Sequence, residues 1–143
     1  MTITPLTRQA LAAAALALSF ITAFAETNSA TAVVRPANYK PLKGNPVAGE
    51  ALFSDTKLST NGMACATCHA NHGAFSATFA KPYPHTVAMA RDQLGHKRMY
   101  LDEMVQACMV MPMAAKPLPW GSKELADLTA YVAELQKSFK PAS

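Results

Sequence analysis

One short run, Cys65-Ala66-Thr67-Cys68-His69, constrains the fold of this chain more than any other feature of its sequence. The two cysteines are three positions apart, so a single helical turn brings both thiols to one side. The next residue is a histidine. This C-x-x-C-H pattern is the attachment pattern for c-type haem, in which each thiol adds to one vinyl group and the imidazole binds the iron. We therefore expect one covalently bound haem c, held by Cys65 and Cys68, with His69 as the proximal ligand.

Three other uses of these residues are weaker predictions. A thioredoxin-like C-x-x-C motif needs a strand before it and a helix after it, and the flanking residues NGMA and ANHG provide neither. A zinc site made of Cys65, Cys68, His69 and His72 would crowd two adjacent ligands around one tetrahedral ion. A disulfide between Cys65 and Cys68 would close too short a loop to add much stability.

The N-terminal residues 1–25 have the pattern of a secretory signal peptide. Arg8 gives a positive start, residues 11–24 are almost entirely apolar, and small residues precede an expected cleavage after Ala25. The apolar run is shorter than the ~20 residues that span a bilayer. We therefore predict a periplasmic protein without stable membrane insertion after cleavage, with a retained N-terminal anchor as the alternative.

The composition excludes several classes of protein. The chain has 143 residues, of which 50% are hydrophobic and 15% charged, and its formal net charge is +4. It is too apolar for a disordered polymer, and three cysteines are too few for a disulfide-rich scaffold. The basic residues are scattered, with only Lys97 and Arg98 adjacent, so nucleic acid is not an expected partner.

The remaining chain divides into a leader and one domain. Residues 26–43 are small, polar or proline and lack periodicity, which predicts a flexible leader that lies loose or wraps the surface. The predicted domain covers 44–140. Helices are expected over about 46–57, over about 98–108, and after Ser122. Asn45, followed by Pro46 in the first turn, and Ser122 are the expected N-caps of the first and the last.

Each expected helix has an apolar face that predicts packing against a core. In chain order these faces are Val47, Ala51 and Leu52; Leu101, Met104, Val105 and Cys108; and Leu125, Leu128, Tyr131, Val132 and Leu135. The intervening segments 70–95 and 109–121 show no strand-like alternation and are expected to be loops. Short helices and long loops make a poor core by themselves, so they need a large apolar object to wrap around.

Three methionines, Met109, Met111 and Met113, lie close together after the second expected helix. A thioether raises the potential of haem iron and suits electron transfer. A methionine at helical spacing is usually core, as Met104 is expected to be. Met113 differs because it follows Pro112 in a loop, from which its sulfur can reach the haem face opposite His69.

With these residues in place, the chain resembles the class I c-type cytochromes over about residues 44–139. Residues 49–53, GEALF, are similar to the segment where that family uses a small residue and an aromatic one to cross the first helix against the last. Tyr131 would be the aromatic partner on the last helix. The resemblance implies an all-α cytochrome c fold, with three to five short helices wrapped around one covalently bound haem.

The second half of the chain carries a more specific resemblance. Residues 105–113, VQACMVMPM, followed by KPLPWGSKELADLTAYV, are similar to the haem domains of thiosulfate dehydrogenase and SoxA-type cytochromes of sulfur oxidation. By that register Met113 is the distal iron ligand, Met111 the second choice and Met109 the third, and a histidine such as His85 or His96, or an open site, is the remaining alternative. Only one C-x-x-C-H is present, and the cysteine-ligated catalytic haem of those enzymes has no counterpart, so a shared domain is implied rather than a shared reaction.

Several further expectations concern the surroundings of the haem. Cys108 lies on an apolar helix face and is expected to be a buried structural thiol. The resemblance implies that a proline carbonyl, of Pro82 or Pro84, accepts the N–H of the ligand imidazole. The aromatic side chains expected to pack near the haem are Phe75, Phe79, Tyr83 and Trp120. For Tyr83 and Trp120 an ordinary half-buried position is favoured, with donation to a haem propionate as the alternative. The histidines expected at the surface or in loops are His72, His85 and His96.

Together these features predict an exported monohaem c-type cytochrome that carries single electrons between redox proteins. It would act as a monomer or in transient complexes, with donor and acceptor unnamed by the sequence. No catalytic residues are assigned, because no arranged set of acid–base groups is present. The alternatives are a haem-binding subunit of a periplasmic oxidoreductase, for example in sulfur-compound oxidation, and a haem sensor with a labile sixth ligand.

Overall fold

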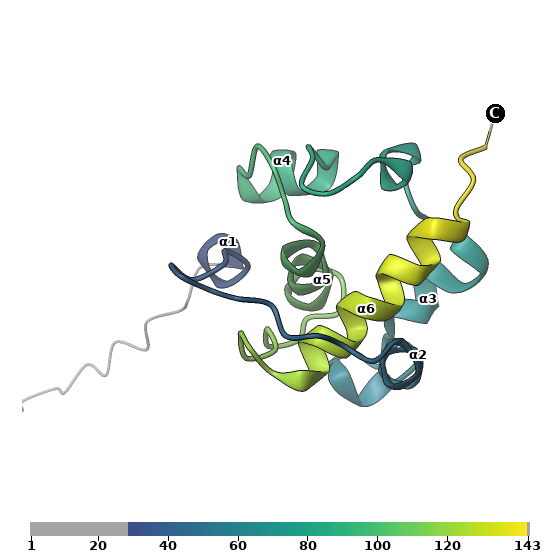
Figure 1. Ribbon diagram of the computed structural model, residues 1–143, viewed down its shortest axis with the longest axis horizontal. Coiled ribbons are helices and arrows are strands. Elements are labelled where there is room, and N and C mark those ends of the chain that lie inside the picture. Colours follow the sequence, from purple (N-terminus) through teal and green to yellow (C-terminus); the bar gives the residue numbers. More distant parts are fainter. Residues whose placement is uncertain (1–28, 143) are drawn as a thin grey trace, which may run out of the picture.

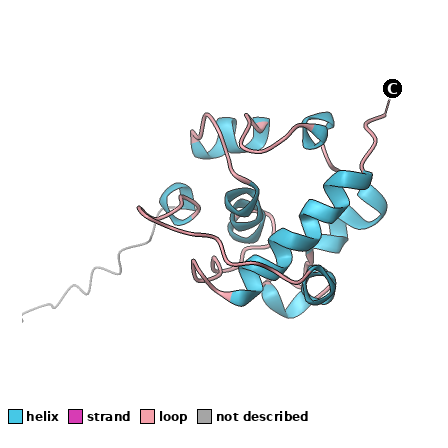
Figure 2. Cartoon of the chain, in the orientation of Figure 1, coloured by secondary structure: helices cyan, strands magenta, loops and turns pink. Residues whose placement is uncertain are grey.

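A computed structural model describes residues 29–142, so the predicted signal peptide lies outside the described residues. The described chain is helical, as predicted (Figure 2). Its one β pairing is an isolated bridge between His85 and Met99. Its elements are α1 (Ser29–Ala32), α2 (Pro46–Phe53), η1 (Thr56–Leu58), α3 (Cys65–His69), η2 (Ala70–His72), η3 (Ala77–Ala80), α4 (Ala88–Leu94), α5 (Leu101–Val110) and α6 (Lys123–Ser138). Here η marks a 3₁₀ helix.

Side-chain N-caps begin helices α2 and α6. The Asn45 side chain accepts a hydrogen bond from the Val47 backbone N–H at 3.0 Å, and Pro46 occupies the first turn of α2. At the start of α6, Ser122 Oγ accepts from the Leu125 N–H at 3.2 Å. Both caps agree with the sequence prediction.

Helices α2 and α6 cross in direct contact (Figure 1). Gly49 lies so close to α6 that a Cβ at this position would overlap the carbonyl of Asp127. One turn later, the rings of Phe53 and Tyr131 meet edge to face with their centroids 5.1 Å apart, which confirms the predicted aromatic pair. Of the predicted apolar face of α2, Leu52 packs against the core, whereas Val47 is 75% exposed and Ala51 is exposed. The buried residues of the helix are Gly49 and Phe53. The face of α2 that carries Gly49 lies against α6 at the crossing.

The expected boundaries of two helices, and one expected loop, also differ from the structure. Helix α2 ends at Phe53, and Asp55 then caps a separate 3₁₀ turn by accepting from the Lys57 N–H at 2.8 Å. Helix α5 begins at Leu101, because the Glu103 carboxylate accepts from the Tyr100 N–H at 2.8 Å. The expected loop 70–95 contains α4, whose apolar pattern is too short to stand out in the sequence.

Within the predicted leader 26–43, the described residues 29–35 contact the domain, as in a segment that wraps the surface and unlike one that lies loose. Val33 is fully buried, among side chains that include Ala90, Met99 and Ala107. Arg35 donates two hydrogen bonds of 2.9 Å to the buried carboxylate of Asp102. A single valine and a single arginine produce no periodicity, so the pattern of the sequence does not reveal this contact.

The main apolar cluster lies between α2, α5 and α6. Its buried members are Phe53, Phe79, Val105, Leu125, Leu128, Val132 and Phe139. The fully buried Gln106 side chain pairs with the backbone of Leu118, donating at 2.6 Å and accepting at 2.9 Å. This pairing holds the segment between α5 and α6 against the domain. Among residues 29–142, no helix is long and apolar enough to cross a membrane.

Candidate haem site

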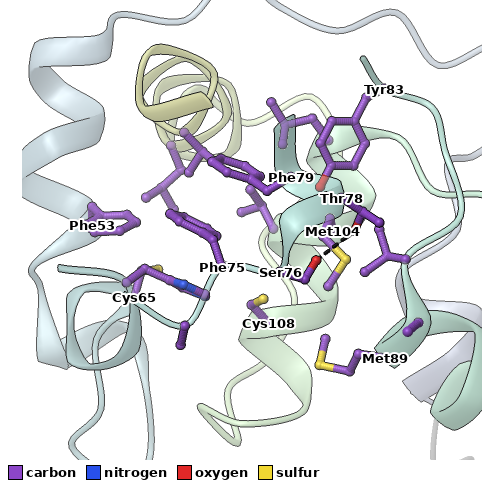
Figure 3. A pocket seen from close by; sticks show the side chains of 18 residues that line it. Phe53, Cys65, Phe75, Ser76, Thr78, Phe79, Tyr83, Met89, Met104 and Cys108 are labelled. Atoms are coloured by element: carbon purple, nitrogen blue, oxygen red, sulfur yellow. Dashed lines mark hydrogen bonds between the residues drawn. The ribbon is translucent and has the colours of Figure 1, made fainter. Parts of the chain in front are cut away.

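A cavity of about 190 Å³ lies between α3, α5 and the segment 74–89 (Figure 3). Its walls are almost entirely apolar. It is lined by Phe53, Cys65, His69, Ala74, Phe75, Ser76, Thr78, Phe79, Tyr83, Val87, Ala88, Met89, Leu101, Met104, Val105, Cys108, Leu128 and Val132. The whole predicted apolar face of α5 is part of this lining. That face was expected to pack on a core, and it forms one wall of the cavity.

The C-x-x-C-H motif forms helix α3, as the spacing requires. Before the helix, the Ala64 N–H donates to Thr67 Oγ1 at 2.9 Å, which satisfies a backbone group that would otherwise lack a partner. The thiols of Cys65 and Cys68 are both free; Cys65 is half-buried in the cavity wall, whereas Cys68 is exposed. Both positions of attachment therefore lie on one helical turn, and of the two only Cys65 lines the cavity.

The His69 ring lines the cavity, and one of its nitrogens has a backbone partner. Its Nδ1 lies 3.0 Å from the carbonyl oxygen of Gly73. Burial lowers the pKa of His69, which favours the neutral ring. When Nδ1 carries the proton, it donates to Gly73 and Nε2 keeps the lone pair that an iron ion needs.

The carbonyl beside His69 is a correction to the sequence prediction, which chose Pro82 or Pro84. The Pro82 oxygen lies 3.2 Å from Nδ1 of His85, and the Pro84 oxygen accepts from Nη2 of Arg98 at 2.8 Å. Asn71, with φ 53°, reverses the chain directly after α3 and brings Gly73 back to the ring.

Aromatic rings occupy one side of the cavity. Phe75 stacks on His69 with the centroids 4.0 Å apart, and on Phe79 with the centroids 3.9 Å apart. Tyr83 also lines the cavity, and burial raises its pKa to about 12, with a smaller contribution from Cys108. Trp120 is not part of the lining; its ring meets that of Tyr39 at 5.0 Å.

The three candidate methionines differ in their burial and in their distance from the attachment motif. Met113 is 2% exposed, and its sulfur lies 3.9 Å from Cys65 Sγ, although Met113 is not among the lining residues. Met109 is buried and Met111 half-buried, and neither lines the cavity. The structure therefore brings Met113 next to the attachment motif.

Sulfur atoms that sequence reasoning did not assign to the site lie in the cavity wall. Met89 comes from α4, and Met104 and Cys108 come from α5 (Figure 3). Cys108 was expected to be a buried structural thiol, and part of its surface opens onto the cavity. Burial raises its pKa to about 12, with smaller contributions from Cys65 and Cys68. No sequence signal distinguishes a helix face that lines a cavity from one that packs on side chains.

The other histidines make contacts to the backbone outside the cavity. Nε2 of His72 lies 3.1 Å from the Leu135 oxygen, and Nε2 of His96 lies 2.8 Å from the Ala30 oxygen. His85 contacts the Pro82 oxygen through Nδ1, and its buried Nε2 has no hydrogen-bond partner. None of the three lines the cavity.

The chemistry of these donors fits a haem better than a bare metal ion. Within the described residues, no group of three or more His, Cys, Asp and Glu side chains could hold a metal ion. An iron ion in a porphyrin needs fewer protein ligands, because the macrocycle supplies its equatorial nitrogens. A covalently attached haem requires a histidine ligand, two thiols on one helical turn and apolar surroundings, and the described residues provide all three.

Comparison with known proteins agrees with this site. Searches of curated proteins and of solved structures found no match. The family model of the SoxA/TsdA cytochrome c domain matches residues 48–140, which include the C-x-x-C-H helix, the cavity walls and α6. The chain therefore belongs to the family of SoxA/TsdA cytochrome c domains, with the cytochrome c fold and the covalently bound haem c that membership implies.

Proposed function

We propose that this protein is an exported carrier of single electrons with one haem c, acting in the periplasm between redox proteins through transient contacts. The observation that carries the proposal is the location of the one C-x-x-C-H motif, on a helical turn in the wall of an apolar cavity. The iron of a bound haem supplies a reversible one-electron couple. The described residues supply no arranged acid–base groups beside it.

The residues of the chain would hold the haem and control its surroundings. Cys65 and Cys68 would tether it, and His69, oriented by the Gly73 carbonyl, would bind the iron. Apolar side chains from α2, α5 and α6 would exclude water from most of the macrocycle. A low-polarity environment disfavours the more highly charged ferric state and so raises the potential.

We propose Met113 as the sixth ligand. Its burial and the contact of its sulfur with Cys65 support the assignment, as does the register of residues 105–113 in the resemblance to SoxA-type haem domains. A specific observation favours a second candidate, because the Cys108 side chain lines the cavity and Met113 does not. Thiolate ligation would favour the alternative function, a haem-binding subunit of an oxidoreductase of sulfur compounds.

Absorption spectra of the purified holoprotein separate these assignments. The ferric protein should show the weak far-red band that marks a methionine sulfur on haem iron. Met113→Ala should abolish the band, whereas Met111→Ala and Cys108→Ala should keep it. If the unaltered protein instead shows the spectrum of a thiolate-ligated haem, and Cys108→Ala loses it while Met113→Ala keeps it, Met113 is not the ligand.

Carbon monoxide tests the carrier proposal directly. A carrier with two firm axial ligands should bind carbon monoxide slowly in its reduced form, because no coordination position is vacant. Rapid binding by the unaltered reduced protein would contradict the carrier proposal and favour a sensor or an enzyme subunit.

A further inference from the structure

Two neighbouring residues, Thr60 and Asn61, hold the backbone on both sides of Met113. Thr60 Oγ1 donates a hydrogen bond of 2.6 Å to the carbonyl of Ala114, and Asn61 Nδ2 donates one of 2.8 Å to the carbonyl of Pro112. These acceptors are the residues immediately after and before Met113. Both donors are more than fifty positions away along the chain and come from the loop that leads into α3.

The Asn61 side chain also contacts the approach to the haem-attachment helix. Its Oδ1 accepts from the Met63 N–H at 3.2 Å, shortly before Cys65. One amide group therefore joins the segment that enters α3 to the loop that carries Met113. The Met113 sulfur also contacts Cys65 Sγ at 3.9 Å, so the same two segments meet at this point too.

The other hydrogen bonds of the Met113 loop run to α5 or stay within the loop, where the Ala114 N–H donates to the Met111 carbonyl at 3.4 Å. The Met113 N–H donates to the Cys108 carbonyl at 3.3 Å, and the Ala115 N–H donates to the Met109 carbonyl at 2.9 Å. Both bonds extend the end of α5. Ala114 adopts a left-handed conformation with φ 47°, which a residue with a Cβ adopts only when its surroundings hold it there. The bond from Thr60 to the Ala114 carbonyl supplies such a restraint.

We propose that Thr60 and Asn61 are positioning residues that fasten the Met113 loop to the C-x-x-C-H segment and thereby limit how readily the Met113 sulfur leaves the iron. This inference rests on the proposed function, with Met113 as the sixth ligand. Both donors are exposed, so water competes for their hydrogen bonds. Their removal should loosen the loop without removing the haem, because neither residue lines the cavity.

The test uses the holoprotein with the double variant Thr60→Val and Asn61→Ala. Thr60→Val keeps the shape of the side chain and removes its hydroxyl. Exogenous imidazole should displace the sixth ligand of the ferric double variant roughly four- to a hundredfold faster, about two- to tenfold for each hydrogen bond lost. The reduction potential should fall, because weaker sulfur ligation stabilises the reduced iron less.

Two further variants distinguish positioning from general stability. The single variant Thr60→Ser, with Asn61 unaltered, keeps both hydrogen-bond donors. Imidazole should displace its sixth ligand as slowly as in the unaltered protein. Ser59→Ala is the matched control, since Ser59 Oγ donates at 3.0 Å to the Thr56 carbonyl within its own turn. Its rate of imidazole binding and its potential should match those of the unaltered protein.

The outcomes separate this inference from the ligand assignment. If Met113→Ala abolishes the far-red band while the double variant binds imidazole at the original rate, the inference is wrong and the assignment stands. If Met113→Ala leaves the band unchanged, the assignment fails and the inference fails with it. Equal acceleration in Ser59→Ala would also overturn the inference, because the effect would then be general loosening.

Discussion

Asp127 joins the start of α2 to α6 through one buried carboxylate. Asp127 is only 3% exposed, and its Oδ1 accepts from the Asn45 N–H at 2.7 Å. Lys123 Nζ donates to both carboxylate oxygens at 2.9 Å. The Asn45 backbone N–H, and then Lys123, lower the pKa of Asp127. A carboxyl group with a lowered pKa in the folded state makes stability depend on pH.

Asp127→Asn should reduce stability in a pH-dependent way. The folded-state pKa lies below the unfolded value, so the contribution of the charge is fully present above ~pH 4 and is lost as pH falls through the folded pKa. The difference in unfolding free energy between the two proteins should therefore be constant near neutral pH and shrink in acid. Chemical denaturation followed by circular dichroism at several pH values measures it.

Glu134→Gln is the control for this prediction. Glu134 pairs with Lys137 at 2.7 Å on an exposed part of α6, where ion pairs contribute little. Its substitution should change stability only slightly over the same pH range. A difference for Asp127→Asn that stays constant down to strongly acidic pH would contradict the role of the charge.

At the scale of elements, the crossing of α2 and α6 depends on the absence of a side chain at Gly49. A Cβ there would overlap the Asp127 carbonyl and would lie 2.8 Å from the Tyr131 Cβ. Backbone cannot move aside as the end of a flexible side chain can. The two helices would therefore have to separate, and the Phe53–Tyr131 contact would separate with them.

Gly49→Ala should lower the unfolding free energy by about 1–3 kcal/mol, the usual cost of overpacking, although alanine has the higher helix propensity. Urea denaturation of the holoprotein measures the change. Glu50→Ala, on the exposed side of the same helix, should have a much smaller effect. Equal or greater stability of Gly49→Ala would show that the crossing adjusts freely.

The helices also show which element properties the sequence carries. The caps Asn45 and Ser122 were predictable, because they act through hydrogen bonds to residues two or three positions away. The apolar face of α5 was predictable as well, but not its environment. Periodicity identifies the side of a helix that avoids water, and a core and a cofactor cavity are equally dry. Helix α4 and the packing of the N-terminal segment through Val33 depend on partners distant in sequence, which periodicity cannot reveal.

At the scale of the whole molecule, the cavity interrupts the apolar interior. Phe53, Phe79, Leu128 and Val132 belong both to the cavity lining and to the main cluster. A covalently attached haem would complete this interior by contacting α2, α5 and α6 together. Any group that binds the folded state alone stabilises that state.

A chain that cannot attach haem should therefore be less stable than the holoprotein. The double variant Cys65→Ala and Cys68→Ala, purified free of haem, should unfold at a lower urea concentration and with a less steep transition than the holoprotein. Circular dichroism at increasing urea measures both. Cys108→Ala, which keeps both attachment thiols, should retain haem and unfold close to the original midpoint. Equal midpoints and slopes for the colourless and haem-bound proteins would contradict a structural role for the haem.

The sequence by itself determined the haem-attachment turn, the helical class and the caps of α2 and α6. Each of these depends on residues within a few positions of one another, where spacing fixes geometry. Only the tertiary structure decided that Gly73 faces His69, that Val33 and Arg35 bind the N-terminal segment to the domain, and that Cys108 lines the cavity. These contacts depend on chain reversals and on packing between distant segments, and their strength comes from burial, which local patterns do not encode.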